Sequence, residues 1–502
     1  MPRLVVIAVA IVFALKVALL AWIGPVYSDD SGGYSDYADA MLASSHWLND
    51  ANLDERAIPL LAYRPLGYPA VIAVAKLAAG PSWPYAVTGL QIVLSLIAFI
   101  AIVEVGIEIC IGLRAAVAAA FAAALFQLPY DQAIMTDSLN ASFIIIALAV
   151  FLRGTIAGKE ITSGQIIVNS GLLVAAFLFR DVLPFLMITM LPLLLLRCAV
   201  TRGVPLARRF APCVLVCLSL VSADAAYNLW NYHRAGSFFV TTIPQTNALT
   251  ATMYAAKNQP GIFSGDTPLE IQARPILKEY DLTEAVKINE ALFNSGYRAP
   301  EIACMAMQKY LKTWREHPLA MLNLIRLTTS ENVLKLLVRP IEAVCELFEL
   351  ARMTPCPDYR DLYRAAFRHP STLTSGEAAM FAATTAQNTV SIILSAYYFF
   401  GIPLLVVLAL RSGAMRDDRP MLLVAGFWIL GVGWHLMYCE ALYTTRYMGP
   451  VLPFMALGAL FAGARLAEHY RISFVPAWLT ERRCAKRPSV LNRAERSRSS
   501  AG

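Results

Sequence analysis

The segment LVVIAVAIVFALKVALLAWIG (residues 4–24) contains a single charged side chain, Lys16. A helix needs about 20 mostly apolar residues to cross the hydrocarbon core of a bilayer, so this segment predicts a membrane span. Arg3 precedes the apolar run, as in a signal peptide. The run is long, however, and no A-x-A cleavage site follows it, which favours an uncleaved first span.

The rest of the chain has the same apolar character. Of its 502 residues, 58% are hydrophobic and only 15% are charged, and the mean hydropathy is +0.55. An average soluble chain has about 25% charged residues. The composition therefore excludes a disordered protein, and it argues against a pair of soluble domains.

Windows of span length predict about ten membrane helices, three of them short. They lie at about 4–24, 84–111, 114–130, 137–153, 165–180, 182–197, 209–230, 385–410, 420–439 and 447–466. The segments 165–180 and 182–197 are either two spans or one re-entrant hairpin. The fold class predicted from the sequence is an all-α polytopic membrane protein with juxtamembrane helices in its first outward loop.

The distribution of charge predicts the orientation of these spans. With ten spans, both termini and the short connectors on their side carry 20 Lys and Arg against 6 Asp and Glu, whereas the opposite side carries 21 against 26. Basic short connectors face the cytoplasm. The long loops 25–83 and 231–384 are therefore expected to face outward, towards the periplasm or a lumen. The net charge of +7 indicates topology rather than a nucleic-acid surface.

The spans and loops predict four segments. They are an N-terminal transmembrane module (1–230), a large outward subdomain (231–384), three C-terminal spans (385–466) and a basic cytoplasmic tail (467–502). In the large loop we expect helices over 300–316 and 318–338, the second amphipathic enough to lie along the membrane surface. The Arg-rich tail is typical of a solvated segment or one that contacts lipid headgroups. We expect no nucleic-acid partner.

The first outward loop opens with YSDDSGGYSDYADAMLASSHW (27–47). A helix over 31–44 would place Asp30, Tyr34 and Ala38 along one face. Helix capping accounts for one acidic residue at this position but not for both Asp29 and Asp30. This start of the loop is therefore a candidate functional site.

The same loop continues with AYRPLGYPAVIAVA (62–75), in which Pro65, Gly67 and Pro69 form a rigid turn into an apolar helix. Arg64 directly precedes this turn, at the expected membrane boundary. It is either an arginine that extends to the interface or a guanidinium that binds phosphate.

The other outward turns also carry charged groups. They contain Asp131 and Asp137, then Arg180 and Asp181, and finally Glu440, Arg446 and Tyr447, with His435 one turn deeper. Asp137 could be a helix cap, and Arg180 could neutralise Asp181. A transport pathway would place such groups through the thickness of the membrane, and no acidic residue lies at the predicted midplane. The shared face therefore favours one common site.

The order of these motifs resembles the polytopic GT-C glycosyltransferases, near the protein O-mannosyltransferase and lipid A aminoarabinose transferase branch (glycosyltransferase family 39-like). The matching elements are D-x-x-x-Y-x-x-x-A at Asp30, RPLGYP, MTDSL at Asp137, GLLVAAFLFRDVLP at Arg180 and TTRYMGPVLPF at Arg446. Two departures are the pair Asp29-Asp30, where many relatives have Asp-Glu, and Asp181 in place of a proline.

The resemblance implies transfer of a hexosyl or pentosyl group from a polyprenyl-phosphate donor to a glycan, lipid or protein acceptor, with inversion. It implies Asp30 as general base, with Asp29 second, and Arg64, Arg180 and Arg446 as cations for the leaving phosphate. Tyr34 and Tyr447 would bind substrate. Asp137 would orient substrate or join Asp30 in holding a divalent cation.

Such an enzyme would lie among membrane lipids, and we expect the inner (plasma) membrane of a bacterium with the site facing the periplasm. Two other readings stay open: a transporter or flippase for a lipid-linked saccharide, and a non-catalytic assembly subunit. Cys304, Cys345 and Cys356 share the large loop, and the sequence does not decide whether they pair.

Overall fold

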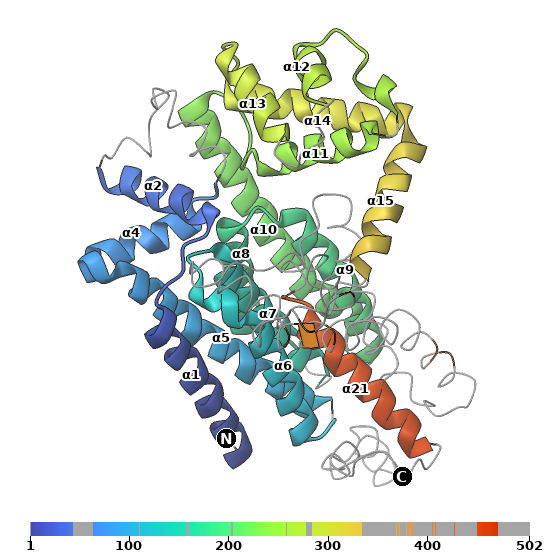
Figure 1. Cartoon of the computed structure of the whole chain (residues 1–502). Helices are drawn as coiled ribbons and strands as arrows, with labels where there is room; N and C mark the ends of the chain where they lie inside the picture. Colours follow the sequence, from blue (N-terminus) through green and yellow to red (C-terminus); the bar gives the residue numbers. More distant parts are fainter. Residues whose placement is uncertain are drawn as a thin grey trace.

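The computed structural model describes residues 2–43, 64–109, 111–156, 160–201, 204–257, 259–277, 284–333 and 449–469, with a few single positions between 368 and 426. Every regular element in these ranges is a helix, and the one strand-like pairing there is a parallel bridge between Val26 and Ala133 (Figure 1). The predicted all-α class is confirmed for the described residues.

Five of the described helices are long and apolar enough to cross a membrane. They are α1 (Arg3–Ile23), the continuous pair α4 (Gly67–Ala79) and α5 (Trp83–Glu108), α6 (Leu113–Gln132), α7 (Thr136–Ile156) and α10 (Leu206–Ala235). The chain is thus a multi-pass membrane protein. Except for α4, which lies in the predicted first outward loop, each helix matches a predicted span to within a few residues, because the apolar windows that define spans are local in sequence.

Three further helices also match predicted spans. The segment left open as two spans or one hairpin forms two separate helices, α8 (Ser163–Phe179) and α9 (Leu183–Val200). The last predicted span, 447–466, overlaps α21 (Leu452–His469). Apart from a few single positions, the predicted spans 385–410 and 420–439 lie outside the described residues.

Small side chains let the spans approach closely. A Cβ atom added at Gly106 of α5 would lie 2.5 Å from the Cβ atom of Ala116 on α6. Ala115, Ala116 and Ala120 are fully buried in this contact region. Lipid tails are as apolar as leucine, so membrane helices associate through such close packing rather than through hydrophobic burial.

Two juxtamembrane helices, α2 (Asp29–Ala43) and α4, pack against each other at one end of the spans. The expected helix over 31–44 is present and begins two residues earlier. Lys76 of α4 donates to Asp39 of α2 at 2.6 Å and lies 5.1 Å from the ring centroid of Trp83. These contacts hold α2 beside the start of α5.

A helical subdomain follows α10. It contains α11 (Ile243–Ala256), η3 (Pro260–Phe263), α12 (Pro268–Ile276), α13 (Glu284–Asn294), α14 (Ala299–Glu316) and α15 (Pro318–Val333). Its core is separate from that of the spans and includes Leu249, Phe263, Ile288 and Met321. Helices α11–α14 lie at the end of the bundle opposite the N-terminus of α1, the end that also carries α2 and α4 (Figure 1).

The structure confirms helices at both stretches predicted in this loop, as α14 and α15. The expectation that the second lies along the membrane surface stays a prediction. Ala320 and Met321 are buried in the core of the subdomain. Leu319 and Leu322 of the same helix are exposed.

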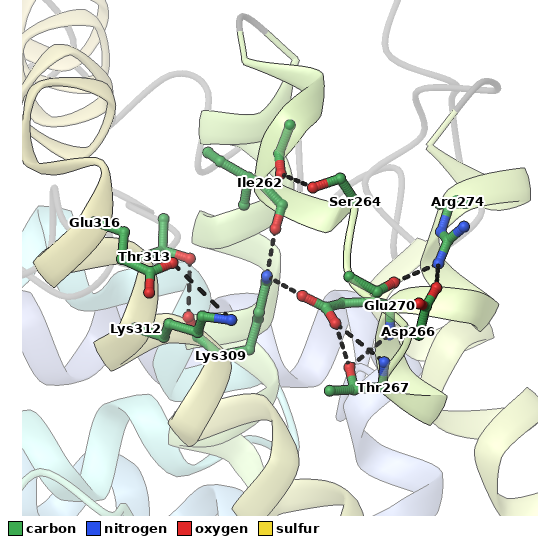
Figure 2. A network of polar contacts seen from close by, with 12 residues as sticks. Ile262, Ser264, Asp266, Thr267, Glu270, Arg274, Lys309, Lys312, Thr313 and Glu316 are labelled. Atoms are coloured by element: carbon green, nitrogen blue, oxygen red, sulfur yellow. Dashed lines mark hydrogen bonds and ion pairs between the residues drawn. The ribbon is translucent and has the colours of Figure 1, made fainter.

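A buried ion pair braces this subdomain (Figure 2). Lys309 of α14 donates to a carboxylate oxygen of Glu270 on α12 and to the carbonyl oxygen of Ile262. Thr267 caps α12 and donates its hydroxyl to Glu270 at 2.7 Å. Burial raises the pKa of Glu270, but the hydrogen bonds from Lys309 and Thr267 lower it more, and the resulting pKa is about 2.

Candidate active site

The backbone joins the start of the first outward loop to the turn before α7. The Val26 amide donates to the Gln132 carbonyl oxygen at 2.9 Å, and the Ile134 amide donates to the Val26 carbonyl oxygen at 2.9 Å. The hydroxyl of Ser31, in the first turn of α2, donates to the Ile134 carbonyl oxygen at 2.8 Å. The two acidic motifs, at Asp30 and Asp137, are therefore carried by segments that pair directly.

Asp30 and Arg64 form the first ion pair of the site. The Nη2 atom of Arg64 lies 2.6 Å from Oδ1 of Asp30, and Nη1 donates to the Tyr34 hydroxyl at 3.1 Å. The guanidinium also lies 4.6 Å from the centroid of the Tyr34 ring. The Asp30 side chain is 34% exposed and that of Arg64 12% exposed. This pair is thus open to solvent on the carboxylate side.

The predicted face of α2 is present. Tyr34 and Ala38 are buried, and Asp30 stands at the open end of the same face. Asp29 is the first residue of α2.

The rigid turn before α4 is locked against the end of α8. A Cβ atom added at Gly67 would lie 2.6 Å from the carbonyl oxygen of Leu178, so only glycine allows this approach. The Leu66 amide donates to the Tyr227 hydroxyl of α10 at 3.2 Å. These contacts place Arg64, just before the turn, beside the element that carries Arg180.

Arg180 and Asp137 form the second ion pair. Nη1 of Arg180 lies 2.6 Å from Oδ1 of Asp137, whose side chain is 6% exposed. The suggestion that Arg180 neutralises Asp181 is therefore wrong. Asp181 instead accepts a hydrogen bond from the Thr241 hydroxyl at 3.0 Å. Adjacent side chains of an extended segment point to opposite sides, which lets each find a separate partner.

Among the acidic groups of this region, Asp181 has the most clearly raised pKa. Burial raises its pKa, the hydrogen bond from Thr241 lowers it, and the nearby Asp224 raises it again, to about 6 overall.

The two ion pairs adjoin one cluster of aromatic rings, here called the aromatic floor, which consists of Tyr34, Tyr68, Phe143 and Phe179. Tyr34 and Tyr68 meet edge to face with ring centroids 5.0 Å apart, and Tyr68 meets Phe179 in the same way at 6.5 Å. Phe143 stacks on Phe179 at 5.4 Å. The rings come from α2, α4, α7 and α8, so the floor connects Asp30 and Arg64 with Asp137 and Arg180.

The described residues do not fit a divalent cation held by Asp30 and Asp137. Each carboxylate is engaged by a guanidinium. No group of three or more His, Cys, Asp or Glu side chains able to hold a metal occurs in the described part of the chain.

Part of the predicted site lies outside the described residues. Glu440, Arg446, Tyr447 and His435 belong to this part, and their place beside Asp30 stays a prediction. Pro450 and Val451, in the described second half of the TTRYMGPVLPF element, are buried.

The sequence analysis missed a buried pair beneath the site. Asp131 was assigned to an outward turn, but it lies in the last turn of α6, fully buried, and accepts a hydrogen bond from Lys16 of α1. The available signal was Lys16 itself, because a lysine within an apolar span needs a partner. The residue that pairs with Lys16 depends on how α1 packs on α6, which the sequence does not show.

Comparisons with known proteins bear on the whole chain. No protein-family model and no curated protein matches the sequence. The structure is similar to that of an oligosaccharyltransferase from Archaeoglobus fulgidus in the apo form, with a TM-score of 0.43 and 12% sequence identity. The match covers 94% of this chain and 52% of that one, so this chain spans about half the length of the archaeal enzyme. At this TM-score the likeness transfers no residue, substrate or activity.

Proposed function

We propose that this protein is a membrane glycosyltransferase that moves a hexosyl or pentosyl group from a polyprenyl-phosphate donor to an acceptor hydroxyl. The transfer takes place at the outer face of the membrane, on the periplasmic side of a bacterial inner membrane. The proposal rests on the resemblance of the motifs to the GT-C enzymes and on the arrangement of the residues that carry those motifs.

The observation that carries the proposal is the pair of Asp–Arg contacts on one aromatic floor. Asp30 with Arg64 and Asp137 with Arg180 come from four segments far apart in sequence. All four adjoin the same ends of membrane-spanning helices. A sugar attached to a lipid phosphate needs a cationic site for the phosphate and a carboxylate for the acceptor, both at the membrane boundary.

Asp30 is the proposed general base. As the acceptor oxygen attacks the anomeric carbon, Asp30 takes the proton of the acceptor hydroxyl, and the bond from the anomeric carbon to the phosphate oxygen breaks. The reaction is a single displacement, so it inverts the anomeric configuration. Asp30 is the more exposed of the two paired carboxylates, which suits a group that receives a proton from an incoming acceptor.

Arg64 and Arg180 are the proposed cations for the departing phosphate. A guanidinium presents five donors in a planar fork, so Arg64 can keep Asp30 and Tyr34 while it also contacts a phosphate oxygen. Arg446 and Tyr447 are proposed to complete this phosphate subsite. Asp137 orients Arg180, and Asp29 is the alternative base.

Replacing Asp30 tests the proposal. Purified protein in lipid vesicles is given a radiolabelled polyprenyl-phosphate sugar together with glycan, lipid and peptide acceptors. We expect Asp30→Asn to lower transfer by roughly 10²- to 10⁴-fold, the range for loss of a general base. The matched control is Asp36→Asn, an exposed acidic residue on the same helix, which should transfer normally. Near-normal transfer by Asp30→Asn would remove Asp30 as the base.

A further inference from the structure

A charged network lies within the spans, beneath the candidate active site. The Lys16 ammonium of α1 donates to Asp131 of α6 and, at 2.7 Å, to the Ser95 hydroxyl of α5. The Ser138 hydroxyl, on α7, donates to the other oxygen of Asp131. Lys16, Asp131 and Ser138 are all fully buried. Four spans thus meet at one ion pair.

Stability alone is a weak reason for such a pair. Taking two charges out of water costs several kcal/mol per ion, and well-packed apolar residues in the same place are often as stable or more so. Ionisable groups inside membrane spans usually serve a function, so the elements that this pair organises are informative.

The network ends on the turn between α6 and α7. The Gln91 amide donates to the carbonyl oxygens of Asp131 at 3.0 Å and of Ala133 at 2.9 Å. The Tyr68 hydroxyl donates to the Gln91 side-chain oxygen at 2.8 Å. Tyr68 belongs to the aromatic floor of the site. The turn is therefore fixed by the Lys16–Asp131 ion pair and, through Gln91, by Tyr68 of the aromatic floor.

The same turn is bonded to the segment that holds Asp30 and leads directly into the helix that holds Asp137. Its Ile134 carbonyl accepts from Ser31, one residue after Asp30, and its Ile134 amide pairs with Val26. Ser138 directly follows Asp137, the partner of Arg180. A shift of this turn would move Asp30 and Asp137 together.

We propose that Lys16 and Asp131 are positioning residues: their ion pair fixes the α6–α7 turn, and through it both Asp–Arg contacts of the active site. This inference rests on the proposed function for its kinetic part only. A misplacement of about 1 Å can cost up to about 100-fold in rate, so a loosened turn should lower kcat and leave binding of the lipid-linked donor, measured as KM, nearly unchanged.

The test compares one broken pair with one removed pair. Lys16→Met leaves a buried carboxylate without its ammonium, whereas Lys16→Met/Asp131→Leu removes both charges. The measurements are the Tm in detergent, hydrogen–deuterium exchange of peptides covering residues 131–138, and kcat and KM for sugar transfer. The matched control is Glu104→Gln/Arg153→Gln, which removes an exposed ion pair between the C-terminal parts of α5 and α7.

For the double variant we expect a Tm close to that of the wild type, faster exchange over 131–138, and a kcat roughly 10- to 100-fold lower at similar KM. The control should change none of these. A double variant with wild-type exchange and wild-type kcat would overturn the inference, because the pair would then only fill space.

Two further outcomes are decided by the same measurements. If the double variant does not insert, the charge-swapped Lys16→Asp/Asp131→Lys replaces it, and it should exceed the kcat of Lys16→Met by about tenfold; no gain would overturn the inference. If the wild-type protein transfers no sugar but the exchange difference is present, the positioning of the turn is supported and the proposed function fails.

Discussion

At the residue scale, the candidate site is defined by which arginine each carboxylate binds. Arg64 is 34 positions from Asp30, and Arg180 is 43 positions from Asp137. Each guanidinium therefore connects two segments at this end of the spans as well as providing a positive charge. Loss of an arginine should disturb both phosphate binding and the orientation of its acid.

Replacing Arg64 separates these two effects. Arg64→Ala removes the contacts with Asp30 and Tyr34, and we expect transfer to fall by roughly 10²- to 10³-fold. Arg64→Lys keeps the positive charge but loses the planar fork of donors, so its activity should lie between those of Arg64→Ala and the wild type. Initial rates with a labelled donor measure this order, with Arg208→Ala, in a surface pair with Glu160, as control. Equal rates for Ala and wild type would exclude Arg64 from the site.

At the element scale, the contact between the start of α4 and the end of α8 brings the two arginine motifs together. The Gly67 backbone lies too close to Leu178 for any side chain. We expect Gly67→Ala to destabilise the protein by about 1–3 kcal/mol through overpacking, and to lower transfer. Gly89→Ala, on α5 with open space around it, should leave Tm unchanged or raise it slightly. Equal Tm values for the two variants would contradict this role.

The sequence predicts the elements of this protein better than their contacts. Apolar windows predict α1, α5, α6, α7 and α10 because that pattern is local, and the Asp-Tyr-Ala spacing is compatible with the helix α2. The choice of Arg180 between Asp181 and Asp137 depends on how α7 packs on α8, with Phe143 stacked on Phe179. The partner of Lys16 is likewise set by packing between helices, which no local pattern contains.

The helical subdomain should lose stability in acid through Glu270. Its pKa is lowered from 4.5 to about 2, so the pair with Lys309 stabilises the fold above pH 4.5, and this contribution, about 3 kcal/mol, is lost as the pH falls towards 2. Hydrogen–deuterium exchange of peptides from 243–327 should therefore accelerate across this interval. In Glu270→Gln the acceleration should be smaller, and the same acid dependence in both proteins would exclude Glu270 as its source.

At the scale of the whole molecule, the candidate active site and the helical subdomain lie at the same end of the spans (Figure 1). The distribution of basic residues predicts that this end faces outward. An acceptor outside the cell would then meet the subdomain and the site on the same side of the membrane.

Cys304, exposed on α14, reports this orientation. In a variant with the other cysteines changed to serine, a membrane-impermeant maleimide should label Cys304 in intact cells. Arg208 lies at the start of α10. In a background that also lacks Cys304, Arg208→Cys should react with the maleimide only after the membrane is permeabilised. The reverse pattern would place the site in the cytoplasm and contradict the proposed orientation.

The most direct test of the central claim follows the fate of the donor in vesicles that contain the purified protein. We predict that each new glycosidic bond releases one polyprenyl phosphate, that the anomeric configuration inverts, and that Asp30→Asn stops both. Intact donor moved to the opposite leaflet without product would instead identify a flippase and contradict the claim.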